Sequence, residues 1–128
     1  MNVHESRRES VAGRLRLGAC GAVAVLCALV VRWIVIAPST PRVVLGAALA
    51  LPLVVGIPFL YVGYRRAYAW QTLALAPPLV LGLTEVVANP AMRSWAALVL
   101  FAVIAAFAVL VAYLRVTRPS SLPSQTAQ

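Results

Sequence analysis

The stretch "WAALVLFAVIAAFAVLVAYL", residues 95–114, runs for twenty residues without a charged side chain. About 20 mostly apolar residues in a helix cross the roughly 30 Å hydrocarbon core of a bilayer. The run does not alternate between apolar and polar residues, which excludes a strand of a membrane barrel. Because only a helix then satisfies its own backbone polar groups in lipid, the stretch predicts a transmembrane helix.

Three earlier stretches have the same character, at residues 17–37, 43–62 and 68–88. The connectors between the spans are short, so consecutive spans must be antiparallel neighbours. The sequence therefore predicts an all-α, integral membrane four-helix antiparallel bundle over residues 17–114. Outside it lie an N-terminal arm, residues 1–16, expected to be solvated unless it extends the first helix, and a polar tail, residues 115–128, expected to be disordered.

The composition supports a membrane protein. The chain is 62% hydrophobic, and its eleven basic residues, all arginine, outnumber three carboxylates to give a net charge of +8. A soluble domain of this size needs far more charge on its surface. The arginines form clusters between apolar runs and not one continuous face, so no nucleic-acid partner is predicted.

The arginine clusters predict the orientation, because cytoplasmic loops carry an excess of basic residues. With the N-terminus cytoplasmic, only two arginines, Arg42 and Arg93, fall on the outer side, and Arg32 lies within the first span. The inner side then holds Arg7, Arg8, Arg14, Arg16, Arg65, Arg66, Arg115 and Arg118. Both termini are therefore predicted to be cytoplasmic.

Aromatic residues near the ends of the spans are interpreted as interface anchors, since Trp and Tyr favour the headgroup level. The predicted anchors are Tyr64, Arg65, Arg66, Tyr68 and Trp70 on the inner side, and Trp33 and Trp95 on the outer side.

Two targeting signals are alternatives to a retained first helix. "LGAC" at residues 17–20 is similar to a lipoprotein cleavage box, but Arg14 and Arg16 precede it where an apolar region is required. A cleavable signal ending at Ala37 has the expected arginines, yet its apolar run is nearly twice the usual length of a signal core. The first span is therefore expected to remain part of the protein.

The sequence offers no group of residues typical of an enzyme or a metal site. Cys20 and Cys27 lie seven residues apart on one predicted helix, about 10 Å along its axis, which is too far for a disulfide. They are interpreted as small packing residues. The single histidine, His4, lies in the N-terminal arm. No catalysis, cofactor or metal is predicted.

Two charged residues within the spans are the main candidates for a functional role, because ionised side chains are costly inside a bilayer. Glu85 lies roughly 4 to 5 Å, and Arg32 roughly 7 to 8 Å, below the same outer end of the bundle at 1.5 Å per residue. One interpretation is an ion pair between the first and third spans. In the other, each side chain reaches the interface separately. Arg93 and Arg42 are competing partners for Glu85.

The third span carries a polar and small stripe. Gln71, Pro78 and Glu85 are spaced by seven residues, with Ala74 and Gly82 beside them, so they share one helix face. Small and polar residues on one face are typical of helix–helix contacts in membranes. The stripe is predicted to face protein and not lipid.

Prolines interrupt two of the spans. Pro77 and Pro78 fall near the middle of the third span, and Pro52 and Pro58 lie inside the second. Each removes a helix hydrogen bond and favours a kink. Broken helices build substrate sites in transporters, but kinked helices also occur in bundles without a transport role.

From the middle connector onward the chain resembles a family of small, uncharacterised bacterial inner-membrane proteins, known as a domain of unknown function. The resemblance rests on "YRRAYAW" at 64–70, "GLTE" at 82–85, "NPAMR" at 89–93 and "YLR" at 113–115. It implies four spans, a bacterial inner membrane and attention to Glu85, and it implies no activity. The family carries aromatic residues where this chain has Pro77 and Pro78, and Arg32 is not part of its pattern.

Together these features predict a non-enzymatic accessory or structural protein of the membrane. It would act through helix–helix contacts with itself, as a homo-oligomer, or with another membrane protein, and the lipid bilayer is its other partner. The alternative is a small oligomeric transporter or proton-coupled carrier. In that case Glu85 is the titratable group, and Pro77 and Pro78 form the gate.

Overall fold

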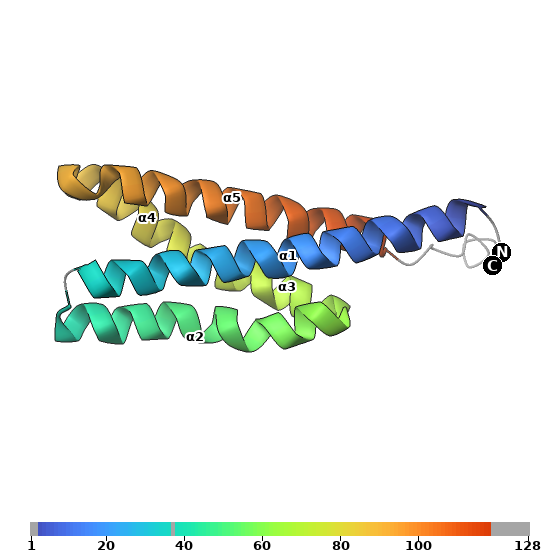
Figure 1. Cartoon of the computed structure of the whole chain (residues 1–128), viewed down its shortest axis with the longest axis horizontal. Helices are drawn as coiled ribbons and strands as arrows, with labels where there is room; N and C mark the ends of the chain where they lie inside the picture. Colours follow the sequence, from blue (N-terminus) through green and yellow to red (C-terminus); the bar gives the residue numbers. More distant parts are fainter. Residues whose placement is uncertain (1–2, 37, 119–128) are drawn as a thin grey trace, which may run out of the picture.

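A computed structural model of the chain describes residues 3–36 and 38–118. Within these residues the chain forms helices joined by short turns, in the order α1 (Val3–Ile36), α2 (Thr40–Val62), α3 (Arg65–Ala74), α4 (Ala76–Ala88), the short 3-10 helix η1 (Pro90–Met92) and α5 (Arg93–Val116). Only Leu75 separates α3 from α4, so the two helices form one interrupted span. The spans run side by side as an elongated bundle (Figure 1).

Four segments of the described chain are long and apolar enough to cross a bilayer: Val3–Ile36, Thr40–Val62, Arg65–Ala88 and Pro90–Val116. Large apolar side chains remain exposed along them, among them Phe101 at 74% and Val87 at 80%. Such surfaces are favourable where the surroundings are lipid and not water. The predicted four-helix membrane bundle is confirmed.

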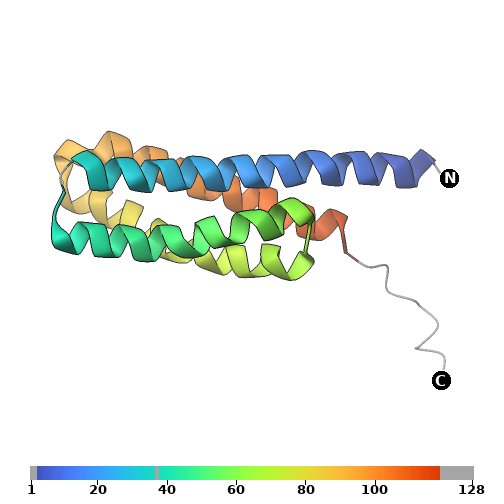
Figure 2. The same cartoon turned by 60° about the horizontal axis from the view of Figure 1, so that its bottom comes forward.

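The first helix is longer than predicted, since α1 begins at Val3 and includes most of the expected solvated arm. Its first turns extend beyond the ends of the other helices (Figure 2). The arm is therefore a continuation of α1, stabilised by Glu5, whose negative charge lies in the first turn near the positive end of the helix dipole. Of the predicted tail, α5 includes Arg115 and Val116, and residues 119–128 lie outside the described residues.

The third span divides where its two prolines predict a break. Pro77 and Pro78 have no N–H, so the carbonyls four residues earlier lose their helical partners. At the junction, the Leu75 N–H donates to the Gln71 carbonyl, and the Leu75 carbonyl accepts from the Leu79 N–H, both at 3.1 Å. As a result α3 packs against α2 and α5, whereas α4 packs along α5.

The second span stays one continuous α-helix despite its inner prolines, Pro52 and Pro58. It ends at Gly63, whose φ of 92° lies in the left-handed region that side chains disfavour. The Gly63 N–H donates to the carbonyls of Phe59 and Leu60, both at 3.1 Å, and so closes the helix end.

Contacts of α1 with α2 and α5 form the centre of the bundle. The buried side chains there are aliphatic or small, and they include Ala19, Val23, Leu26, Val30, Val99, Ala102, Ala106 and Leu110. Alanines at this position let the helix backbones approach closely, which is the main source of helix association in lipid.

Candidate functional site

The stripe on the third span faces the inside of the bundle, as its spacing predicts. Gln71, Pro78 and Gly82 are buried, and Ala74 and Glu85 are half-buried. Gln71 on α3 is the most informative of these, because it is a polar side chain with only 3% of its surface exposed.

Gln71 ties α3 to the backbone of α2. Its Nε2 donates to the Leu53 carbonyl at 3.3 Å. A β-carbon added at Gly56 would collide with the Gln71 side-chain amide, so the missing side chain at Gly56 makes room for this contact. Next to Leu53, the carbonyl of Val54 has no helical partner, because Pro58 lacks an N–H. Gln71 therefore stabilises a stretch of α2 that its own proline weakens.

Two stacked tyrosines lie nearer the end of the bundle where the chain begins. The rings of Tyr68 (α3) and Tyr113 (α5) are 3.8 Å apart between centroids and 14° from parallel. The Tyr68 hydroxyl donates to the Leu60 carbonyl at 3.0 Å, and the Tyr113 hydroxyl donates to the Gly63 carbonyl at 3.2 Å. Both hydroxyls thus bind carbonyls at the carboxyl end of α2.

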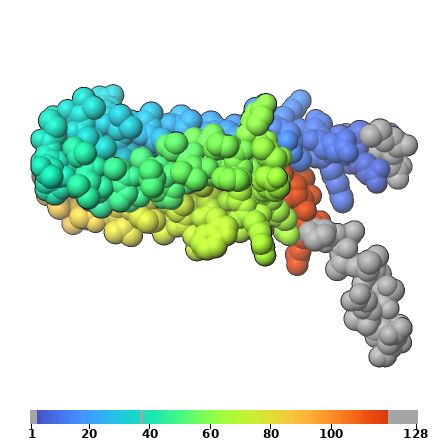
Figure 3. Space-filling view, turned by 90° about the horizontal axis from the view of Figure 1, so that it is seen from below, coloured from blue at the N-terminus to red at the C-terminus, as the bar shows by residue number. Residues whose placement is uncertain are grey.

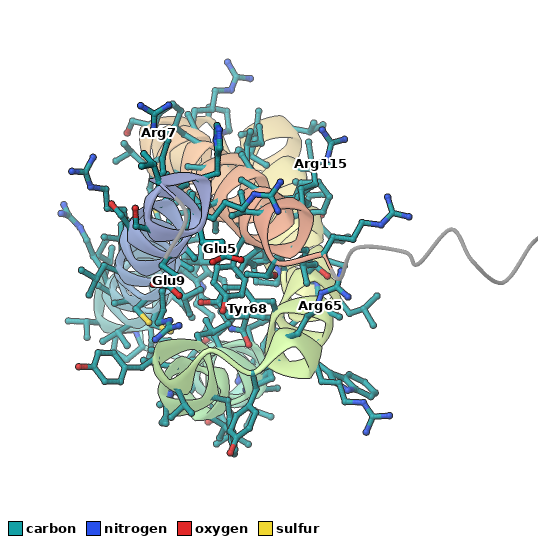
Figure 4. All side chains as sticks on the ribbon, turned by 90° about the vertical axis from the view of Figure 1, so that its right-hand side faces the viewer. Glu5, Arg7, Glu9, Arg65, Tyr68 and Arg115 are labelled. Atoms are coloured by element: carbon teal, nitrogen blue, oxygen red, sulfur yellow. The ribbon has the colours of Figure 1, made fainter. Side chains whose placement is uncertain are left out.

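Tyr68, predicted as an interface anchor, is buried in the bundle, and its depth relative to the membrane interface stays a prediction. Tyr68 has no exposed surface and lies within the ring of helices (Figure 4). The Leu60 carbonyl accepts from both the Gly63 N–H and the Tyr68 hydroxyl, so the buried tyrosine satisfies its own hydroxyl while its ring fills the core. The other predicted anchors at this end, Tyr64, Arg65, Arg66 and Trp70, are exposed.

Arginines surround the same end of the bundle. The Arg65 Nη2 donates to the Leu114 carbonyl at 3.2 Å, which links the turn after α2 to the end of α5. A β-carbon added at Gly63 would lie 2.8 Å from Arg16 Nη2, so the α1 side chain reaches this turn closely. Arg7 and Arg115 point outward from the rim (Figure 4). The end is strongly positive.

Glu85 lies near the opposite end, on α4. Its Oε2 accepts from Asn89 Nδ2 at 3.4 Å, a long hydrogen bond. Arg93 instead donates its Nε to the Val86 carbonyl at 3.2 Å. Across residues 3–36 and 38–118, no arginine lies within ion-pair distance of a glutamate.

The structure therefore does not bring Arg32 and Glu85 together. Arg32 is exposed and lines a small hollow against the start of α5, with Met92 and Ser94. Both α1 and α4 pack on α5, and Arg32 lies on the part of α1 that faces the α5 start. The structure thus shows no ion pair between them, and whether each side chain reaches the outer interface stays a prediction.

A tryptophan pair at this end was not expected from the sequence. Trp33 and Trp95 stack with ring centroids 5.9 Å apart, and the Arg42 guanidinium carbon lies 5.1 Å from the Trp33 ring centre. The Trp95 Nε1 donates to the Leu29 carbonyl at 3.0 Å. Their exposed fractions, 3% and 6%, show that both rings are buried between helices, and their place at the outer interface stays a prediction. The sequence shows that Trp33 and Trp95 are present, but it has no pattern from which their stacking between two helices could be predicted.

Groups suited to metal or covalent chemistry do not gather within the described residues. No cluster of three or more His, Cys, Asp or Glu side chains occurs there. Cys20 and Cys27 are free thiols on α1, and the Cys20 Sγ lies 4.0 Å from the Ile57 carbonyl oxygen. Among the polar side chains of the spans, Gln71, Tyr68, Tyr113 and Trp95 bind backbone carbonyls outside their own helices.

Four apolar spans, joined by short turns and held by side chains bound to backbone carbonyls, define a small polytopic membrane protein. Residues 17–118 match the model of a family described as predicted membrane protein, DUF2069. The chain belongs to this family, which confirms the resemblance seen in the sequence. Comparison with curated proteins and with solved structures finds no match.

Proposed function

We propose that this protein is a non-enzymatic accessory protein of a bacterial inner membrane, with both termini cytoplasmic, which acts through helix–helix contacts. The observation that carries the proposal is the use of the polar side chains inside the spans. Gln71, Tyr68, Tyr113 and Trp95 each donate to a backbone carbonyl outside their own helix.

These hydrogen bonds favour a fixed scaffold over a moving carrier. A transport pathway needs polar groups that exchange their partners for a substrate or ion. Here each of the four side chains instead binds a carbonyl outside its own helix. Breaking such a bond would leave a buried polar group without a partner. The bundle thus holds one arrangement, and its outer surface is what remains for interactions.

A shallow groove between α1 and α5 is the surface best suited to another helix. Its volume is about 320 Å³, and Gly21, Ala22, Val25, Leu98 and Ala105 are among the residues that line it. Small residues let a second backbone approach closely, which supports packing between membrane helices. We assign this groove to self-association.

The substitution Gly21→Leu tests this assignment, because an added β-carbon at Gly21 meets nothing within 4 Å and the fold should tolerate it. In vesicles, energy transfer between donor- and acceptor-labelled copies should be high for the wild type, fall on dilution with lipid, and be weakened by Gly21→Leu. Gly13→Leu is the matched control, since Gly13 is equally open but does not line the groove. A wild type that remains monomeric at all dilutions would refute self-association.

A second candidate function, a proton-coupled carrier, is favoured by one observation. The third span is interrupted at Leu75, and among residues 3–36 and 38–118 the only side-chain partner of the Glu85 carboxylate is Asn89, through a long bond. The reconstituted wild type and Glu85→Gln should be compared for proton-linked flux. A flux that disappears in a folded Glu85→Gln protein would replace the accessory proposal.

A further inference from the structure

A groove between α2 and α3 opens on the side of the bundle. Its volume is about 810 Å³, within the roughly 300–1,000 Å³ typical of pockets for small molecules. Phe59, Trp70 and Leu73 form its apolar rims, with exposed fractions of 49%, 71% and 67%. Figure 3 shows the face of the molecule on which α2 (green) and α3 (yellow-green) lie side by side.

The groove exists because small residues form its floor between large ones at its edges. Gly56 has no side chain, and Ala67 and Ala74 contribute only methyl groups. The floor is closed by Gln71, whose amide is already bound to α2. The space therefore faces the surroundings of the bundle and not its interior.

One end of the groove is charged. Arg66 lines it, is exposed, and has no carboxylate partner in the described part of the chain. Glu5 and Glu9 lie in the first turns of α1, and Glu85 lies on α4 near the opposite end of the bundle. The Arg65 side chain is bound to the Leu114 carbonyl, which leaves Arg66 as the cation at the groove.

The length of the groove fits a molecule that enters the bilayer from its surface. From Arg66 to Ala74, α3 rises about 12 Å, and from Phe59 back to Pro52, α2 rises about 10 Å. This is most of the roughly 15 Å between the surface and the middle of the hydrocarbon core. The Arg66 end of the groove lies at the tyrosine- and arginine-rich end of the spans. The apolar rims of the groove extend from there toward the middle of the spans.

We propose that this groove binds a phospholipid with an anionic headgroup. The phosphate contacts the Arg66 guanidinium, which is suited to phosphate oxygens, and an acyl chain lies between Phe59, Trp70 and Leu73. The neighbouring arginines raise the local concentration of anionic lipid, and Arg66 with the groove holds one molecule. This site is separate from the α1–α5 groove assigned to self-association.

Trp70 provides the measurement, because bromine atoms on lipid acyl chains quench a tryptophan that they touch. The other two tryptophans are buried near the opposite end, so the difference between wild type and Trp70→Phe isolates the Trp70 signal. In vesicles of the full chain, brominated anionic phospholipid should quench Trp70 at a lower mole fraction than brominated zwitterionic phospholipid. This preference should fall about five-fold in Arg66→Gln and by a smaller factor in Arg66→Lys, which keeps the charge but not the guanidinium.

Arg115→Gln is the matched control, since it removes one charge from the same end without lining the groove. It should keep the preference. Val55→Phe, which fills the groove at an exposed position, should lower Trp70 quenching by both lipids while circular dichroism stays unchanged.

Three results would overturn the proposal. The first is a wild type without preference for the anionic lipid, and the second is an equal loss in Arg66→Gln and Arg115→Gln, which would mean general surface attraction. The third is a Trp70 protected from both lipids until the protein is diluted, which would mean that a second copy fills the groove.

Discussion

Gln71 and Gly56 lie in close contact between α2 and α3, because the amide of Gln71 occupies the space that a side chain at Gly56 would fill. The same amide donates to the Leu53 carbonyl three residues earlier on α2. The buried Gln71 amide therefore has room because residue 56 is a glycine, and its hydrogen bond is accepted by the Leu53 carbonyl.

Replacing this glycine should destabilise the bundle. Gly56→Ala introduces a β-carbon into the Gln71 amide, and displacing that amide should cost about 1–3 kcal/mol of the free energy of unfolding in mixed micelles. In the Gln71→Ala background the same substitution should cost much less, because the obstacle is gone. Gly21→Ala, at an open helical site, should be neutral or slightly stabilising. Equal costs of Gly56→Ala in both backgrounds would contradict the close approach.

The turn after α2 should resist substitution for a different reason. Gly63→Ala places a β-carbon at a φ of 92° and 2.8 Å from Arg16 Nη2. The backbone conformation alone should cost about 1–2 kcal/mol of stability. In an Arg16→Ala background, Gly63→Ala should lose less stability, because the steric clash with Arg16 is gone. The cost of the left-handed backbone conformation should remain. A Gly63→Ala protein as stable as the wild type would argue against the left-handed helix end.

The tyrosine pair should act as one unit. Tyr68→Phe and Tyr113→Phe each remove a hydroxyl from a carbonyl of the α2 end and should each cost about 0.5–1.5 kcal/mol. The stacked rings remain in both variants, so Tyr68→Ala should cost more. A double-mutant cycle with alanine at both positions should show a coupling of about 0.5–1.5 kcal/mol, measured by unfolding in mixed micelles. Additive costs would mean that the rings do not support each other.

The charges near the other end should behave independently. Arg32→Gln and Glu85→Gln should have additive effects on stability, within about 0.3–0.5 kcal/mol, because the two side chains do not contact each other. Asn89→Ala and Glu85→Gln should not be additive, since Asn89 donates to the Glu85 carboxylate. A clear coupling between Arg32 and Glu85 in the double-mutant cycle would restore the ion pair between the first and third spans.

Several features of the fold were predictable from the sequence because lipid imposes simple requirements. A span must be apolar for about 20 residues and must satisfy its own backbone, so uninterrupted apolar runs predict four helices. A proline must break a helix hydrogen bond, so Pro77 and Pro78 predict the interruption of the third span. Seven-residue spacing places Gln71 and Pro78 on one face, and that face is buried.

The aromatic residues show why other features required the tertiary structure. Tyr68, Trp33 and Trp95 have an apolar ring and one polar atom, which suits both the headgroup level and a place in the core. Their sequence positions near span ends favour the first, but the carbonyls of Leu60 and Leu29 and the opposing rings place Tyr68 and Trp95 in the core.

Sequence alone therefore determined that this chain forms four helices in a membrane and that prolines remove hydrogen bonds in two of them, of which only the third span is interrupted. Tertiary structure decided which polar groups are bound, that Arg32 and Glu85 are apart, and that α2 and α3 enclose a groove beside Arg66. The reason is physical: outside the polar stripe of the third span, a span in lipid is apolar on all its faces, so its hydrophobic pattern fixes its length but leaves open which face meets another helix.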